Sequence, residues 1–305
     1  MSDTFAAIDC GTNSVRLLVR RGDTDLVRRA EITRLGRGVD ATGRLGDEGL
    51  AATLAVLREY RAQAADLGVE SFRVVATSAA RDAANADELL GPVRELFGTE
   101  AEILDGETEG RWSYAGAVEG LGVADDGVRT LVLDIGGGSC ELAVGTAESE
   151  GAISLDIGSV RLTERLVEHD PPRAEELSAM LSLVDAHVDE AVQLLPAIAE
   201  AERLVGVAGT ITTVAAVEIG LLEWDRDRVH GFVLTREAVE DVFRTLATEA
   251  LADRVHNPGL PAERADVIVA GCCILVAVMR RLGFDECLVS DADLLDHIVA
   301  DQAGR

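Results

Sequence analysis

The chain has 305 residues, of which 48% are hydrophobic and 27% charged, and this composition excludes disordered and fibrous proteins. Its 28 Lys and Arg residues stand against 55 Asp and Glu residues, which gives a formal net charge of -27 at pH 7. So acidic a surface repels nucleic acid and anionic membranes, and we expect neither as a partner. No apolar run reaches the roughly 18 to 20 residues that span a bilayer, so a cytoplasmic protein is predicted.

The first half of the chain alternates strand-like apolar runs with helical patterns, which is typical of an α/β protein. Thr4–Ile8 and Val15–Val19 predict the two strands of a hairpin, whose tip is the polar segment from Asp9 to Ser14. The remaining pattern predicts helices over Asp47–Leu67, Arg81–Phe97 and Glu107–Leu121, and strands over Phe72–Ala76 and Glu102–Leu104.

After a Gly- and Asp-rich stretch from Gly120 to Gly127, which is the predicted linker, the opening pattern returns. Thr130–Leu133 and Cys140–Val144 predict a second hairpin, with Asp134–Ser139 at its tip. Asp170 and Pro171 are interpreted as the N-cap and first position of a helix. Further strands are expected over Ala152–Ile157 and Leu204–Val207, and further helices from Gly158, over Arg173–Leu195, after Gly209, and over Ala262–Leu282 and Ala292–Ala300.

Both hairpin tips contain Asp-x-Gly, and the repeated pattern predicts two related half-domains that face one cleft. Glycine lacks the Cβ that would block a phosphate, so such tips can bring backbone N–H groups to phosphate oxygens. Their carboxylates would repel a bare phosphate. They fit this chemistry if a divalent cation lies between carboxylate and phosphate, and this predicts Asp134 and Glu141 as metal-binding residues.

The ordered motifs of the chain resemble the Ppx/GppA phosphatase family of exopolyphosphatases and guanosine pentaphosphate phosphohydrolases. The motifs are Asp9-x-Gly11-x-Asn13-Ser14-x-x-Leu17, Thr77-x-Ala79-x-Arg81-x-Ala83-x-Asn85, Gly106-Glu107-Thr108-Glu109, Asp134-x-Gly136-Gly137-Gly138-Ser139-x-Glu141, Gly158-Ser159-Val160-Arg161, Gly206–Thr210 and Arg264-Ala265-Asp266. The resemblance implies two ribonuclease H-like α/β domains of the actin/hexokinase-type superfamily, with the active site in the cleft between them. The domains would be residues 1–124 and 125–305, with a C-terminal helix at about 292–305 that packs back on the first.

The resemblance also implies roles for individual residues. Glu109 is the expected general base that takes a proton from the attacking water, and Arg81 would neutralise phosphoryl charge. Glu107 is interpreted as a carboxylate favoured by a helix N-terminus. The expected metal ligands for Mg²⁺, or another divalent ion, are Asp134, Glu141 and Asp9. The expected phosphate-binding residues are Asn13, Ser14, Gly136, Gly137, Gly138, Ser139, Gly158, Ser159, Arg161, Gly209 and Thr210, with a structural role left open for Arg161.

The implied activity is Mg²⁺-dependent hydrolysis of the terminal phosphate of inorganic polyphosphate. Two alternatives stay open, namely a guanosine pentaphosphate 5′-phosphohydrolase and a non-catalytic sensor of polyphosphate or an alarmone, whereas a sugar kinase lacks identifiable sugar contacts. The chain resembles the short two-domain form of the family, from which we expect a preference for shorter polymers. The apolar segment Val267–Met279 is either core or a homodimer contact.

The chain contains five cysteines and five histidines, and neither set has the spacing of a metal site. An odd number of cysteines without a CxxC pair also argues against a disulfide framework. Cys10 and Cys140 flank the two tips, so oxidation that distorts a tip is a minority hypothesis beside core packing.

Overall fold

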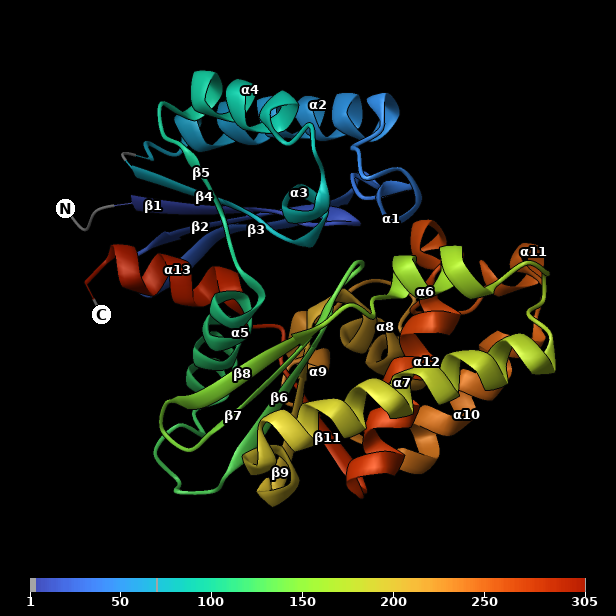
Figure 1. Ribbon diagram of the computed structural model, residues 1–305. Helices are drawn as coiled ribbons and strands as arrows, with labels where there is room; N and C mark the ends of the chain where they lie inside the picture. Colours follow the sequence, from blue (N-terminus) through green and yellow to red (C-terminus); the bar gives the residue numbers. More distant parts are fainter. Residues whose placement is uncertain (1–3, 70, 305) are drawn as a thin grey trace.

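The computed structural model describes residues 4–69 and 71–304 and contains two mixed β-sheets with helices on both faces of each (Figure 1). In the first sheet the strand order is β3-β2-β1-β4-β5, with β1, β2 and β3 antiparallel and β4 and β5 parallel to β1. These strands are β1 (Thr4–Cys10), β2 (Ser14–Arg21), β3 (Thr24–Ile32), β4 (Ser71–Ala76) and β5 (Ala101–Ile103).

The second sheet repeats this order and adds one strand at its edge, giving β10-β11-β9-β6-β7-β8. Its strands are β6 (Thr130–Ile135), β7 (Cys140–Gly145), β8 (Ser149–Leu155), β9 (Arg203–Val207), β10 (Val233–Thr235) and β11 (Glu286–Val289). Again three antiparallel strands are followed by parallel ones, with β9 beside β6 and β11 beside β9. Both sheets have the ribonuclease H-like arrangement, so the predicted fold class is confirmed.

Two helices cover one face of the first sheet and one covers the other. On the first face lie α2 (Asp47–Asp66) and α4 (Asp87–Phe97), whose Leu57, Tyr60 and Val93 are fully buried. On the opposite face lies α13 (Leu294–Gln302), where Ile298 packs in one cluster with Leu18. The last helix of the chain therefore completes the first sheet, although it follows a strand of the second (Figure 1).

Just as α13 packs on the first sheet, one helix of the first half of the chain packs on the second sheet. It is α5 (Gly106–Gly120), which follows β5 but packs on β6, β7 and β8. Where α5 meets α13, Gly116 leaves room for the backbone of Asp293. The division of the chain at residues 124 and 125 stays a prediction, since each half contributes one helix to the other half's sheet. The second sheet's other face is covered by α7 (Ala174–Leu194), α8 (Ala208–Ile219), α10 (Arg236–Thr248) and α12 (Ile268–Leu282).

Short helices complete the chain. They are α1 (Val39–Thr42), α3 (Ser78–Asp82), α6 (Ser159–Leu166), α9 (Arg226–Val229), α11 (Leu251–Arg254) and two 3-10 turns, Pro196–Glu200 and Ala262–Arg264. The apolar residues of α12 are buried in this chain's own second core, which supports the core interpretation of Val267–Met279. Among the described residues, no helix is both long and apolar enough to span a membrane.

Three helix predictions were wrong in detail. In the helix expected over Ala262–Leu282, Ala262–Arg264 forms a 3-10 turn and only Ile268–Leu282 is α-helical. The helix expected over Arg81–Phe97 is broken after Asp82, because Asn85 exchanges two hydrogen bonds with the backbone of Leu45, at 2.8 and 3.1 Å, and so holds the chain outside helical geometry. The N-cap of α7 is Arg173 rather than Asp170. The Asp170 carboxylate instead accepts from the N–H of Leu251 at 2.9 Å.

Candidate active site

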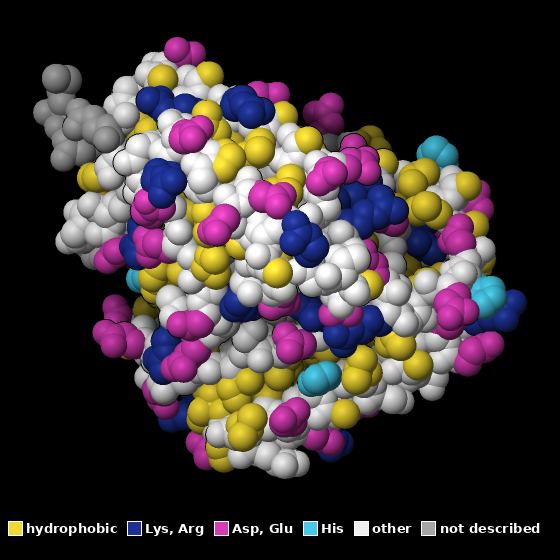
Figure 2. All heavy atoms as spheres, turned by 45° about the horizontal axis from the view of Figure 1, so that its top comes forward, with side chains coloured by type: hydrophobic (Ala, Val, Ile, Leu, Met, Phe, Trp, Pro, Cys, Tyr) yellow, Lys and Arg dark blue, Asp and Glu magenta, His cyan; other side chains and the backbone are white. Residues whose placement is uncertain are grey.

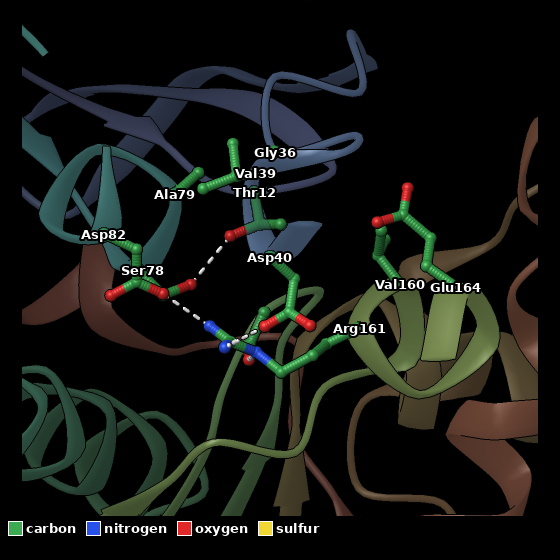
Figure 3. Close-up of a pocket in the computed structure, with 11 residues that line it drawn as sticks. Thr12, Gly36, Val39, Asp40, Ser78, Ala79, Asp82, Val160, Arg161 and Glu164 are labelled. Atoms are coloured by element: carbon green, nitrogen blue, oxygen red, sulfur yellow. Dashed lines mark hydrogen bonds and ion pairs between the residues drawn. The ribbon is translucent and has the colours of Figure 1, made fainter. Parts of the chain in front are cut away.

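The two hairpin tips approach each other between the two sheets. Thr12 in the first tip shares a 2.7 Å hydrogen bond with Ser78 at the start of α3 (Figure 3). A Cβ on Gly137 would lie 3.1 Å from the Cβ of Thr12, and one on Gly138 would lie 2.5 Å from the Ser78 hydroxyl. Glycine at both positions therefore permits the second tip to approach Thr12 and Ser78 closely.

Four buried carboxylates gather beside these tips, and each is at most 8% exposed. Asp9 is the last residue but one of β1, while Asp134 and Glu141 face each other in the β6–β7 register. Glu109 lies in the first turn of α5, and its neighbour Gly110 lets the helix approach Glu141 closely. The hairpin pattern in the sequence was enough to predict that Asp134 and Glu141 lie close together. A two-stranded hairpin with a short tip places the residues before and after the tip opposite each other.

Burial and mutual repulsion make these groups weak acids. Desolvation and the Asp134 charge raise the pKa of Glu141 to about 8, and desolvation raises that of Asp134 to about 6. Burial, followed by the charges of Glu141, Asp134 and Asp9, raises the pKa of Glu109 well above its usual value. The site therefore favours any cation that enters it.

Hydrogen bonds satisfy only part of this cluster. Asp9 Oδ2 accepts from Arg16 at 2.8 and 3.0 Å, Asp134 Oδ2 accepts from Ser113 at 2.6 Å, and Glu141 Oε1 accepts from Ser154 at 2.7 Å. Asp9 Oδ1 and Glu141 Oε2 are buried without a donor. In the described part of the chain, no three His, Cys, Asp or Glu side chains converge as a complete metal site. The two unpaired oxygens fit Mg²⁺, which takes one or two carboxylates and completes its shell with water and phosphate.

Glu109 and Arg81 are in direct contact. Arg81 Nη1 donates to Glu109 Oε2 at 3.3 Å and to the carbonyl of Leu104 at 2.7 Å. The side chain of Asp105 caps α5 by accepting from the N–H of Thr108, which fixes the turn that carries Glu109. Glu107, in contrast, is 61% exposed and pairs with Arg111 four residues later. Glu109 is therefore buried and Glu107 exposed, and the roles assigned to them stay predictions.

The glycine tip of the second hairpin is braced from behind by α6. The N–H of Ser159 donates to the Gly136 carbonyl at 3.0 Å, and the N–H of Val160 donates to the Gly137 carbonyl at 2.9 Å. A side chain on Gly158 would overlap the backbone of Gly137. Gly158 and Ser159 therefore lie beside the predicted phosphate loop. The N–H of Ser159 is already used by its hydrogen bond to the Gly136 carbonyl of that loop.

The other predicted phosphate-binding residues differ in whether their side chains have a hydrogen-bond donor that no protein group uses. Asn13 is 7% exposed, and its buried Nδ2 has no acceptor in the described structure, so it can donate to a ligand. Ser14 begins β2, and Gly209 and Thr210 open α8. The Arg161 guanidinium is engaged by the Gly138 carbonyl and by two carboxylates.

Two arginines and one carboxylate complete the site, and the sequence did not assign roles to them. Arg16 bridges Asp9 and Asp293, the N-cap of α13. The guanidinium of Arg264 lies against Gly209, and no carboxylate partner of Arg264 is found among the described residues. Burial and the charge of Arg16 lower the pKa of Arg264 to about 10. An arginine inside the apolar strand β2 was a usable signal for Arg16, because unpaired charges are rarely buried.

A model of the Ppx/GppA phosphatase family matches residues 18–304. The chain belongs to this family. It is 37% identical over 316 aligned residues to Exopolyphosphatase 2 of Mycobacterium tuberculosis, with 98% of each chain covered. It is 26% identical to the guanosine-5′-triphosphate,3′-diphosphate pyrophosphatase of Photobacterium profundum, over 100% of this chain and 60% of that one. A crystal structure of the Aquifex aeolicus Ppx/GppA family member matches with a TM-score of 0.79 and 32% identity, over 99% and 98% of the two chains.

In this Ppx/GppA phosphatase, the two cysteines beside the tips are fully buried. Burial, together with the charge of Asp9, raises the pKa of Cys10, and burial with the charges of Glu141 and Asp134 raises that of Cys140. Thiolates are the oxidisable form, so both environments favour core packing over redox sensitivity.

Proposed function

We propose that the protein is an exopolyphosphatase that removes the terminal phosphate of inorganic polyphosphate with Mg²⁺, and that it favours shorter chains. The observation that carries the proposal is the contact of Glu109 with Arg81 inside a buried group of carboxylates, beside two glycine-containing tips. The name of the M. tuberculosis relative supports this substrate.

In the proposed reaction, Glu109 accepts the proton of a water whose oxygen attacks the terminal phosphorus. The phosphoanhydride bond breaks, and the shortened polyphosphate leaves as an oxyanion. Arg81 neutralises charge on the phosphoryl oxygens. Its charge also opposes the burial and the neighbouring carboxylates that raise the pKa of Glu109, and so favours the ionised form that acts as a base. Mg²⁺ would be held by Asp9 and Glu141, each of which has a buried oxygen without a donor, with Asp134 beside them, and it would supply further charge neutralisation.

The phosphate would be held by donors that the structure leaves available. Asn13 Nδ2 has no partner in the described structure, and Arg264 offers a guanidinium over Gly209. The surface as a whole is acidic, and carboxylates are spread over the face in Figure 2 with arginines between them. Capture of a polyanion therefore depends on the local arginines, because the long-range field opposes it. Added salt or Mg²⁺ should accordingly speed association.

The second candidate is hydrolysis of the terminal phosphate of guanosine pentaphosphate. The same site chemistry would serve, and the P. profundum relative favours it. The sensor alternative is weaker, since binding alone does not call for a buried glutamate in contact with an arginine.

The test is phosphate release by the purified protein with Mg²⁺ from short polyphosphate, long polyphosphate and guanosine pentaphosphate. We expect the highest kcat/KM on short polyphosphate. Release from guanosine pentaphosphate alone would replace the proposed substrate by the second candidate. Binding of polyphosphate without any release would establish the sensor.

A further inference from the structure

A cluster of ion pairs joins the two sheet domains beside the glycine tips. On the second domain, α6 carries Arg161, whose Nη1 donates to Asp40 at 2.7 Å and whose Nη2 donates to Asp82 at 2.5 Å. Both carboxylates belong to the first domain, on α1 and α3, and Figure 3 shows Arg161 reaching between them. Arg165 also donates to Asp40, at 2.5 and 2.6 Å.

We call this group of ion pairs, formed by Arg161, Arg165, Asp40 and Asp82, the clasp. Further contacts across the same domain boundary reinforce it. The carboxylate of Glu164 accepts from the N–H of Gly38 at 3.0 and 3.2 Å. The pair between Arg34 and Asp266, at 3.2 Å, lies between the first domain and the segment before α12. Each contact joins a residue of one domain to a residue of the other, so separation of the two domains would break it.

Arg161 differs from the other members of the clasp because it also touches the candidate phosphate loop. Its Nε donates to the carbonyl of Gly138 at 2.6 Å, so one guanidinium binds three acceptors in three directions. The planar guanidinium of arginine spreads its donors over three nitrogens, which suits acceptors that lie apart, whereas lysine carries all its donors on one nitrogen. The Arg161 side chain is only 11% exposed, and Asp40 is 18% exposed, whereas Asp82 at 33% retains contact with water.

The bond to Gly138 has a consequence for the loop. In a trans peptide, the C=O of one residue and the N–H of the next point in opposite directions. Holding the Gly138 carbonyl toward Arg161 therefore turns the N–H of Ser139 away from Arg161. If the domains separate, Asp40 and Asp82 leave Arg161, and the guanidinium loses two of the three groups that fix its position.

We propose that Arg161 is a positioning residue that couples closure of the two domains to the orientation of the Gly136–Ser139 loop. The inference rests on the proposed function, because the loop matters through the phosphate that it binds. Asp40 and Asp82 then act from the opposite domain as the groups that set Arg161. In the closed state, Arg161 acts through the loop and not as a phosphate ligand.

The test compares Arg161→Met with Asp40→Asn in steady-state phosphate release from short polyphosphate. Positioning predicts that both variants lose kcat, by about tenfold or more, with KM within about threefold of the wild type. If Arg161 is itself a phosphate ligand, Arg161→Met raises KM, while Asp40→Asn frees the guanidinium and lowers KM at unchanged kcat. That opposite response would overturn the inference.

Matched controls come from a pair confined to the second domain. Arg281 and Asp189 form a 2.5 Å ion pair on the surface, so Arg281→Met and Asp189→Asn make the same chemical changes without touching the clasp. Both should keep wild-type kcat and KM. Arg161→Lys retains the positive charge but lacks the three separate nitrogens of the guanidinium. If Arg161 is a positioning residue, this variant should regain less than half of the kcat that Arg161→Met loses, and full recovery would contradict that role.

Small-angle scattering of the unliganded proteins separates this inference from the proposed function. Loss of the clasp should increase the radius of gyration of Arg161→Met and Asp40→Asn, and leave both controls unchanged. A wild type without phosphate release would refute the proposed function, yet the scattering would still test the clasp. Unchanged scattering together with unchanged kcat in both variants would refute the inference while the activity stands.

Discussion

Gly116 of α5 lies against the backbone of Asp293, the N-cap of α13, and Gly116→Ala should disturb both fold and site. A Cβ at Gly116 would lie 1.8 Å from the backbone oxygen of Asp293, whereas ordinary contact begins near 3.4 Å. One helix must therefore move by about 1.6 Å. Overpacking costs about 1–3 kcal/mol, and alanine regains roughly 0.5–1 kcal/mol in a helix, so we expect a net loss of up to about 2.5 kcal/mol.

The displacement also reaches the chemistry. Asp293 caps α13 by accepting from the N–H of Leu295, and its carboxylate pairs with Arg16, which in turn holds Asp9. Because misplacement by about 1 Å can cost about 100-fold in rate, phosphate release by the variant should fall by about tenfold or more.

The assay is urea unfolding followed by circular dichroism, together with phosphate release at saturating polyphosphate. Gly91→Ala is the matched control, since Gly91 lies inside α4 and a Cβ there meets nothing within 4 Å. It should gain up to about 1 kcal/mol and keep its activity. If Gly116→Ala is as stable and as active as Gly91→Ala, the helix exchange does not support the site in the way described.

Three further predictions follow from the site. Arg264→Met should raise KM for polyphosphate by about tenfold or more with a smaller effect on kcat, and an unchanged KM would remove Arg264 from the binding site. The raised pKa of Glu141 means that the folded state binds a proton more tightly than the unfolded state. Stability in EDTA should therefore fall as pH rises from about 4.5 to 8, with a shallower fall in Glu141→Gln and after addition of Mg²⁺; urea midpoints that do not change over this range would contradict the assignment. Peroxide should leave Cys10 and Cys140 unmodified in the folded protein, as mass spectrometry would show, and sulfenic acid on either would contradict their buried environments.

The parts of the site that the sequence predicted are those that local chain geometry determines. Asp134 and Glu141 face each other because a short tip sets the register of one hairpin, and the polar tip was visible between two apolar runs. The α/β class was likewise evident from alternating periodicities. Resemblance to the family then added Glu109 and Arg81, which no local pattern distinguishes from an ordinary helix-start glutamate and a surface arginine.

What the sequence could not predict depends on contacts between distant segments. Arg16 meets Asp293 across 277 positions, and Arg264 meets Gly209 through the packing of the segment before α12. Strand β3 was missed because its residues are charged, a pattern explained by pairing such as that of Arg28 with Asp296 of α13. Such ion pairs form only when α13 packs on the first sheet. The hydrophobic periodicity of the β3 sequence therefore cannot reveal them.

The central claim is that Glu109 is the base of a phosphoanhydride hydrolase, and one comparison tests it most directly. Phosphate release from short polyphosphate with Mg²⁺ should be measured for the wild type, Glu109→Gln and Glu107→Gln. These two variants carry the same substitution two residues apart, one at a buried position beside Arg81 and one on the surface. The account predicts that Glu109→Gln loses about 100- to 10,000-fold in kcat while remaining folded, and that Glu107→Gln retains wild-type activity. Activity of Glu109→Gln within about threefold of the wild type would contradict it.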